Sequence, residues 1–205
     1  MDARDVVIFG CLVVAVILHE ISHGVVALIY GDDTAKRAGR LTLNPLPHID
    51  PLGSVILPAM AVLAGAPVLG WAKPVPVNPS KLRDPRRQML YVGLVGPCTN
   101  FALMMLAAIA ARALSGGATG SGIDLYIVFR AFALVNLFLG IFNLLPIPPL
   151  DGSSLIERFL PRNWLPTWWK IRPFGFLILF LGLFYLDIFG AIISPFAGAL
   201  SDFIG

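Results

Sequence analysis

Residues 6–30 read VVIFGCLVVAVILHEISHGVVALIY, an apolar run interrupted by one polar cluster, His19-Glu20-Ile21-Ser22-His23. A membrane-spanning helix needs about 20 predominantly apolar residues, so the run is long enough to cross a bilayer. It predicts a first spanning helix over residues 5–30, with three ionisable side chains at a depth where lipid would surround them. Such side chains are costly in lipid unless a helix bundle or an ion satisfies them, which indicates a function for the cluster.

The cluster has the spacing HExxH. On a helix, His19 and His23 lie on one face, one turn apart, so both imidazoles can reach a single ion. Imidazole nitrogen suits zinc, and two histidines leave half of a tetrahedral shell to be filled. Glu20 directly follows the first histidine, where zinc hydrolases carry the general base. The motif therefore predicts a hydrolytic zinc site inside a membrane helix.

The composition supports a membrane location. Of the 205 residues, 57% are hydrophobic and 13% are charged, and the mean hydropathy is +0.82. A soluble domain has about 25% charged residues, so the chain is expected to be an integral membrane protein in contact with the lipid bilayer. The net charge is +3, but the basic residues lie in short loops and form no arm or stripe, which argues against a nucleic-acid partner.

We expect an all-α polytopic membrane protein with about four spanning helices, within one domain that covers residues 1–205. The expected spans are residues 5–30, 89–113, 124–147 and 174–193. The first three belong to a core at 5–158, and the last is a separate C-terminal span that stops near Pro195. Residues 40–44 alternate between polar and apolar side chains and predict a short membrane-associated β element, with an ordinary loop as the alternative.

Residues 52–70 are apolar but are broken by Pro58, Gly65 and Pro67, and their topology has two solutions. If they turn back, three basic loops share one side of the membrane: residues 31–50, 72–88 and 149–173. That side then holds 12 of the 15 Lys and Arg residues, and the positive-inside rule places it in the cytoplasm. A full crossing would divide the basic loops between the two sides. We therefore predict that residues 52–70 are re-entrant.

A catalytic zinc site has three protein ligands, so one more residue is required. Four side chains are candidates for it: Asp151, His48, Asp50 and Asp187. Asp151 is the best placed, because it ends Asn143-Leu-Leu-Pro-Ile-Pro-Pro-Leu-Asp-Gly152, in which three prolines must unwind a helix near membrane depth. Irregular backbone at that depth is tolerated only where protein or a watery cavity surrounds it. A turn or capping role for Asp151 is the alternative.

Three motifs together resemble a known family, the site-2 proteases, which are membrane-embedded zinc metalloproteases that cut transmembrane segments of other proteins. These motifs are HEISH at 19–23, Gly96-Pro97-Cys98-Thr99-Asn100, and NLLPIPPLDG at 143–152. The resemblance covers residues 5–158 and implies His19, His23 and Asp151 as ligands of one zinc ion, with Glu20 as the catalytic base. It also implies that Asn100 and Asn143 help to hold the substrate chain.

The function expected from the resemblance is regulated intramembrane proteolysis of a transmembrane protein substrate. The small size and the absence of PDZ and CBS domains suit a minimal enzyme of a prokaryotic plasma membrane. Two other functions remain as alternatives: a zinc transporter or sensor, and an inactive relative that only binds membrane partners. A transporter would require further polar residues along its spans, and in these spans few are present apart from Arg130 and Asn136.

Overall fold

The computed structural model describes residues 2–56, 59–60, 63, 70–117, 124–175, 177, 179, 182 and 188–205. These residues form helices, turns and irregular segments, and they contain no β-strand. Three helices are long and apolar enough to cross a membrane: α1 (Ala3–Ile29), α4 (Pro85–Leu114) and α5 (Leu125–Leu144). The protein is therefore a membrane protein, and three of the expected spans are present.

The first spanning helix, α1, is continuous through the HExxH motif. It begins with a capping box, in which the Asp2 side chain accepts hydrogen bonds from the backbone N–H groups of Arg4 and Asp5. It ends before Gly31, whose φ of 107° suits a residue without a side chain. The short helix α2 (Thr34–Arg37) follows directly. The motif thus lies toward the end of α1 that faces the basic loops.

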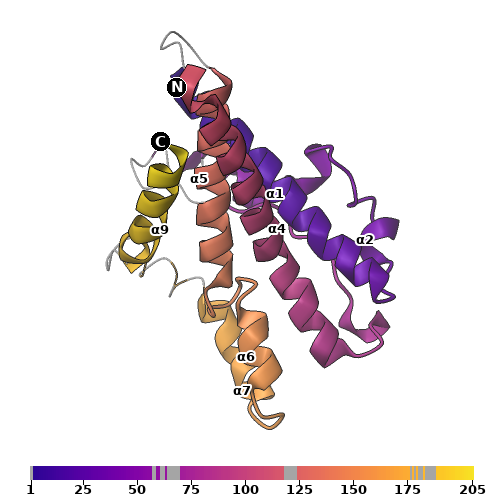
Figure 1. Cartoon of the computed structure of the whole chain (residues 1–205). Coiled ribbons are helices and arrows are strands. Elements are labelled where there is room, and N and C mark those ends of the chain that lie inside the picture. Colours follow the sequence, from indigo (N-terminus) through magenta and orange to yellow (C-terminus); the bar gives the residue numbers. More distant parts are fainter. Residues whose placement is uncertain are drawn as a thin grey trace.

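The three spanning helices pack against one another, with α4 antiparallel to α1 and α5 (Figure 1). Pro85 occupies the start of α4, where its missing N–H costs nothing, and the Asp84 side chain caps this end. Pro97 lies inside α4 without ending it. After α5 the chain turns into α6 (Ser153–Phe159) and α7 (Leu165–Ile171), which lie beyond its C-terminal end (Figure 1).

The remaining elements are short, except for one helix at the C-terminus. The short ones are η1 (Leu46–His48), η2 (Pro51–Ile56), η3 (Pro79–Lys81), η4 (Ser115–Gly117) and η5 (Arg172–Phe174). The C-terminal helix α9 (Ile188–Ile204) packs on α4 and α5 near the end of the molecule where both termini lie (Figure 1). Small residues form the apolar core there, with Leu200 and Ile204 of α9 buried among alanines of α4 and α5.

The expected β element at residues 40–44 is not formed, because its backbone has other partners. Arg40 donates its backbone N–H to the carbonyl of Ala35 in α2, and the carbonyl of Thr42 accepts from the ring of His48. The Arg40 side chain, rather than a strand ladder, contacts the neighbouring segment through the carbonyl of Lys73. Residues 41–43 are therefore bends.

The C-terminal helix differs from the expected span at 174–193. α9 continues through Pro195 to Ile204, although proline removes one backbone hydrogen bond. Burial of Leu200 and Ile204 against the bundle favours this continuation. Much of 174–187 falls outside the described residues, as does most of the predicted re-entrant segment at 52–70.

Candidate metal centre

The two histidines of α1 are buried, and each has one ring nitrogen engaged by the neighbouring helix α4. The Nδ1 atom of His23 lies 2.6 Å from the backbone carbonyl oxygen of Val92. A carbonyl oxygen only accepts, so Nδ1 of His23 carries the proton. In the neutral imidazole, this leaves the lone pair on Nε2 free to bind a metal.

His19 is held in the same tautomer by two buried asparagines, which we call the amide relay. Asn136 of α5 donates its Nδ2 to the carbonyl of Phe132 at 2.9 Å, so its Oδ1 faces Asn100 and accepts from Nδ2 of Asn100, also at 2.9 Å. The Oδ1 of Asn100 then lies 2.6 Å from Nδ1 of His19. The relay starts at the carbonyl of Phe132, which only accepts hydrogen bonds. This fixes which group donates in each of the three bonds, and Nδ1 of His19 is the donor in the last one.

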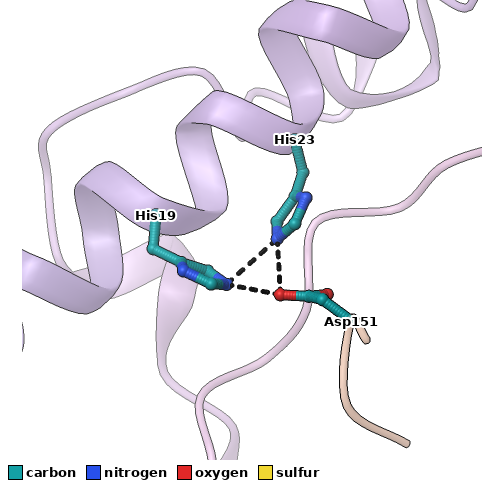
Figure 2. Close-up of side chains that lie close together, drawn as sticks. All are labelled: His19, His23 and Asp151. Atoms are coloured by element: carbon teal, nitrogen blue, oxygen red, sulfur yellow. Dashed lines mark hydrogen bonds and ion pairs between the residues drawn. The ribbon is translucent and has the colours of Figure 1, made fainter. Parts of the chain in front are cut away.

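Both Nε2 atoms therefore present lone pairs, and they point at the carboxylate of Asp151 (Figure 2). The two Nε2 atoms are 3.0 Å apart. Oδ2 of Asp151 lies 3.0 Å from Nε2 of His19 and 3.3 Å from Nε2 of His23. Oδ2 is buried, and no described residue donates a hydrogen bond to it. Three proton-free acceptors converge here, an arrangement that a cation stabilises.

The spacing of the three atoms fits zinc. A tetrahedral ion with bonds of about 2.0–2.1 Å places neighbouring ligand atoms about 3.3–3.4 Å apart. Two imidazole nitrogens and one carboxylate oxygen are also ligands that zinc accepts, and three protein ligands leave one coordination position open. The residues thus fit a zinc ion of the catalytic type, and they form the single group of this kind found in the described part of the chain.

Asp151 reaches the histidines through the turn that follows α5. The backbone N–H of Gly152 donates to the carbonyl of Asn143 at 2.7 Å, which folds the turn onto the last residues of α5. A Cβ atom at position 152 would collide with the backbone carbonyls of Leu144 and Leu145. The close approach requires glycine, and it explains the order Asp-Gly at this point of the sequence.

Two glycines of α4 leave room for the centre. A Cβ atom at Gly96 would lie 2.5 Å from Cε1 of His19 and 2.5 Å from Nε2 of His23. A Cβ atom at Gly93 would lie 2.5 Å from Oγ of Ser154 and 3.2 Å from the carbonyl oxygen of Asp151. The glycines therefore permit the close helix packing that brings α1 and the Asp151 turn together.

Glu20 lies beside the ligands on α1, and a segment without regular secondary structure at residues 72–78 holds one of its oxygens. The backbone N–H of Val75 donates to Oε2 of Glu20 at 2.7 Å. The other end of this segment is anchored at Asp32, whose Oδ2 accepts from the backbone N–H of Asn78 at 2.6 Å. Burial by itself would raise the pKa of Asp32, but hydrogen bonds from Thr34 and Asn78 outweigh it, so the pKa lies below its usual value.

The side chains of Asn143, His48 and Asp50 have hydrogen-bond partners outside the three ligands. The Nδ2 atom of Asn143 donates to the carbonyl of Leu139 in its own helix at 3.0 Å. His48 donates to the carbonyl of Thr42, and Asp50 accepts from the backbone N–H groups of the following turn. Asp187 is outside the described residues. Of the three candidates that the structure describes, Asp151 is therefore the one placed beside the histidines.

Three contacts of the centre were not foreseen from the sequence. One is the hydrogen bond between Asn136 of α5 and Asn100 of α4, which connects Asn136 to His19. The other two contacts are backbone groups, the carbonyl of Val92 and the N–H of Val75, which leave no signal in a sequence. The spacing of Asn100 and Asn136 alone does not reveal that they meet.

Comparisons with known proteins link this geometry to a family. The sequence model of peptidase family M50 matches residues 114–168, which include Asp151. A Bacillus subtilis protein named "Putative zinc metalloprotease YwhC" is 36% identical over 201 residues, which are 94% of this chain and 86% of the relative. No solved structure matches the chain.

Two further relatives are longer than this chain. A Mycolicibacterium smegmatis protein named "Putative zinc metalloprotease Rip2" is 32% identical over 165 residues, which are 79% of this chain and 60% of the relative. A Methanocaldococcus jannaschii protein named "Zinc metalloprotease MJ0392" is 24% identical over 158 residues, which are 77% of this chain and 35% of the relative.

Proposed function

The chain belongs to peptidase family M50, the site-2 proteases, and on this basis we propose that it is an intramembrane zinc endopeptidase. Its substrates would be membrane proteins, cut within or next to a transmembrane segment. The observation that carries the proposal is the convergence of two imidazole lone pairs and one carboxylate oxygen inside a bundle of apolar helices. This donor set supports a metal centre, and the neighbouring carboxylate of Glu20 supports hydrolysis.

We propose His19, His23 and Asp151 as the ligands of one zinc ion per chain. A zinc ion held by these side chains supplies Lewis acidity, which activates water as a nucleophile near pH 7 and polarises a carbonyl. Helix α4 holds both histidine rings in place, because the Nδ1 atom of each is hydrogen-bonded to a residue of α4. Such second partners fix the orientation of metal-binding rings.

Glu20 is proposed as the general base and acid. Its Oε2 accepts a hydrogen bond from Val75, while its Oε1 has no hydrogen-bond partner among the residues that the structure describes. We therefore place the transferred proton on Oε1, which takes it from the attacking water and gives it to the leaving amine nitrogen. Positioned proton transfer of this kind contributes about 10²–10⁴-fold to a rate.

The substrate must unwind before it is cut, because a helix hides its carbonyl groups in hydrogen bonds. Glycine or proline in the substrate span makes this unwinding easier. We propose Asn143 as a residue that holds the opened chain, since its side chain is partly exposed and its Oδ1 has no partner within the described structure. Asn100 is fully buried, and both of its side-chain polar atoms are engaged in hydrogen bonds. This supports a role in holding His19 in place and not a role in contacting the substrate.

We propose that the basic loops and the metal centre face the same side of the membrane, the cytoplasmic side of a prokaryotic plasma membrane. Hydrogen bonds between the two ends of the predicted re-entrant segment support this topology. The backbone N–H of Trp71 donates to the carbonyl of Gly53 at 3.2 Å, and Oγ of Ser54 donates to the carbonyl of Trp71 at 2.8 Å. A segment whose ends are bonded together starts and finishes on one side.

The experiment combines zinc content with proteolysis for the detergent-purified protein. Wild type should hold one zinc per chain and cleave members of a pool of reconstituted single-span proteins with varied spans. Glu20→Gln should keep the zinc but lose at least about 100-fold in cleavage rate, because it removes the proton carrier and leaves the ligands intact.

Three further variants separate the ligands from a histidine outside the centre. His23→Ala and Asp151→Ala should lose the zinc, whereas His48→Ala should keep it, since its ring is bonded to a backbone carbonyl. Full activity of Glu20→Gln would contradict the proposed base. Zinc without cleavage in any preparation would instead favour a transporter, a sensor or an inactive relative.

A further inference from the structure

Three of the 15 Lys and Arg residues lie away from the basic loops: Arg4, Arg112 and Arg130. Arg112 has partners, because its guanidinium donates to the backbone carbonyl of Phe203 and lies 5.0 Å above the centre of the Phe203 ring. Arg4 and Arg130 are exposed, and within the described residues neither guanidinium has a hydrogen bond or an ion pair. These two cations therefore lack an anion that the described protein supplies.

Arg4 and Arg130 line the same groove. The groove has a volume of about 590 Å³ and lies between α1 and α5. α1 contributes Arg4, Val7, Ile8 and Leu12, and α5 contributes one face between Tyr126 and Phe138. Apart from the two arginines, the walls are formed by apolar and aromatic side chains. The groove thus combines two positive charges with an otherwise apolar surface.

The positive charges lie toward one end of the groove: Arg4 is the first lining residue of α1, and Arg130 lies about one turn after Tyr126, the first lining residue of α5. α1 and α5 begin at the same end of the molecule and run in the same direction (Figure 1). Arg4 is in the first turn of α1 and Arg130 is in the second turn of α5. From each arginine the lining continues for eight residues along its helix, to Leu12 and to Phe138, which is about 12 Å. Along the groove, the two arginines are therefore followed by apolar lining residues toward the membrane interior.

We propose that this groove binds an anionic phospholipid, with the phosphate between Arg4 and Arg130 and an acyl chain along the apolar floor. Arginine in a membrane segment is costly without a partner, and its planar fork matches phosphate oxygens. An anionic headgroup satisfies both guanidiniums where the hydrocarbon begins, and the groove walls cover the chain. The site is separate from the metal centre and does not depend on the proposed function.

The charges distinguish this occupant from others. A zwitterionic lipid brings its own ammonium group next to two guanidiniums, which lowers the gain from the phosphate. A transmembrane peptide fits the apolar walls, but it satisfies the arginines only if an acidic residue lies at the right depth. An anionic phospholipid provides both the charge and the chain in one molecule.

The test uses the full chain in detergent and measures bound lipid by native mass spectrometry. Phosphatidylglycerol and phosphatidylcholine with identical acyl chains are added at equal concentrations. We expect phosphatidylglycerol to be retained and phosphatidylcholine to be retained at least about fivefold less, given the contribution of each basic residue to the attraction of anionic lipid. The double variant R4Q/R130Q should lose roughly tenfold in phosphatidylglycerol retention.

Arg112→Gln is the matched control, since it removes a third arginine remote from the basic loops without touching the groove. It should retain phosphatidylglycerol as the wild type does. Equal retention of both lipids, or unchanged retention in R4Q/R130Q, would overturn the proposal. If the double variant fails to fold, as judged by its circular dichroism, the single variants R4Q and R130Q test the site instead. A loss of phosphatidylglycerol retention no larger than that of Arg112→Gln would then contradict the proposal.

Discussion

α4 packs against its neighbours in two different ways along its length. In the half near the two chain termini, which we call the alanine half, Ala107, Ala108 and Ala111 of α4 pack on Ala133 and Leu137 of α5. In the other half, which we call the metal half, the glycines of α4 face the two histidines and the Asp151 turn. Both halves bring backbones close together through small residues, as is typical where lipid provides no hydrophobic force between helices.

The difference lies in what the small residues contact. In the alanine half they meet apolar side chains, and this packing holds the helices together. In the metal half they make room for polar side chains that satisfy one another through the amide relay and the carbonyl of Val92. The comparison teaches that one helix can supply both the mechanical support and the inner wall of a polar centre.

The largest expected effect is that of Gly96→Ala. Its methyl group would occupy the space of both histidine rings, so we expect the variant to lose zinc affinity by at least about 100-fold. A chelator competition titration on the purified protein measures this. Gly10→Ala is the control, because a Cβ atom at Gly10 meets nothing within 4 Å and alanine favours the helix. Equal zinc binding by Gly96→Ala would show that the metal half is less tightly packed than the contacts of a Cβ atom at Gly96 indicate.

Asn136→Ala tests the amide relay at a residue that contacts no ligand directly. The change leaves Asn100 without its acceptor, so His19 loses the support that fixes its tautomer. We expect zinc affinity to fall by about 10–100-fold, the range found for partners of metal ligands. The same titration provides the measurement, with the helix content as a check on folding. An unchanged affinity would mean that α1 positions His19 without the relay.

Ile204→Val makes the complementary change in the alanine half. Ile204 is buried against α4 and α5, and removal of one methylene group should lower the free energy of unfolding by about 1 kcal/mol. Zinc affinity of the folded protein should not change. Thermal unfolding in detergent and the chelator titration, performed on one preparation, separate the two effects. A loss of zinc affinity in this variant would contradict the independence of the two halves.

The smallest effect concerns Asp32, which anchors the irregular segment 72–78 through the backbone N–H of Asn78. Because the pKa of Asp32 is lowered in the folded protein, its contribution is present above the unfolded value of about 3.9 and is lost as pH falls through the folded value. Hydrogen exchange at the backbone N–H of Asn78 should therefore lose protection in acid more steeply in wild type than in Asp32→Asn. Parallel curves for the two proteins would show that Asp32 is not the acid-sensitive anchor.

The sequence predicted the parts of the fold that depend on local pattern. Three spans were expected within a few residues of their ends, since an apolar run of sufficient length has no other stable form in lipid. The prediction of a β element at 40–44 was wrong, because the alternation of polar and apolar side chains over five residues does not reveal that the backbone groups of Arg40 and Thr42 have other partners. The C-terminal span ended too early at Pro195, since its packing on α4 and α5 involves residues far away in sequence.

The metal centre likewise has a part that local sequence pattern predicted and a part that depends on long-range packing. The sequence by itself determined that His19 and His23 share one face of a membrane helix with Glu20 beside them, because helical periodicity sets this spacing. The turn rich in proline before Asp151 indicated irregular backbone near membrane depth. Only the tertiary structure decided that Asp151, rather than His48 or Asp50, lies at 3.0 and 3.3 Å from the histidine nitrogens, and that Asn136 supports His19. The physical reason is that these contacts join segments separated by tens of residues, whose meeting depends on how the helices pack.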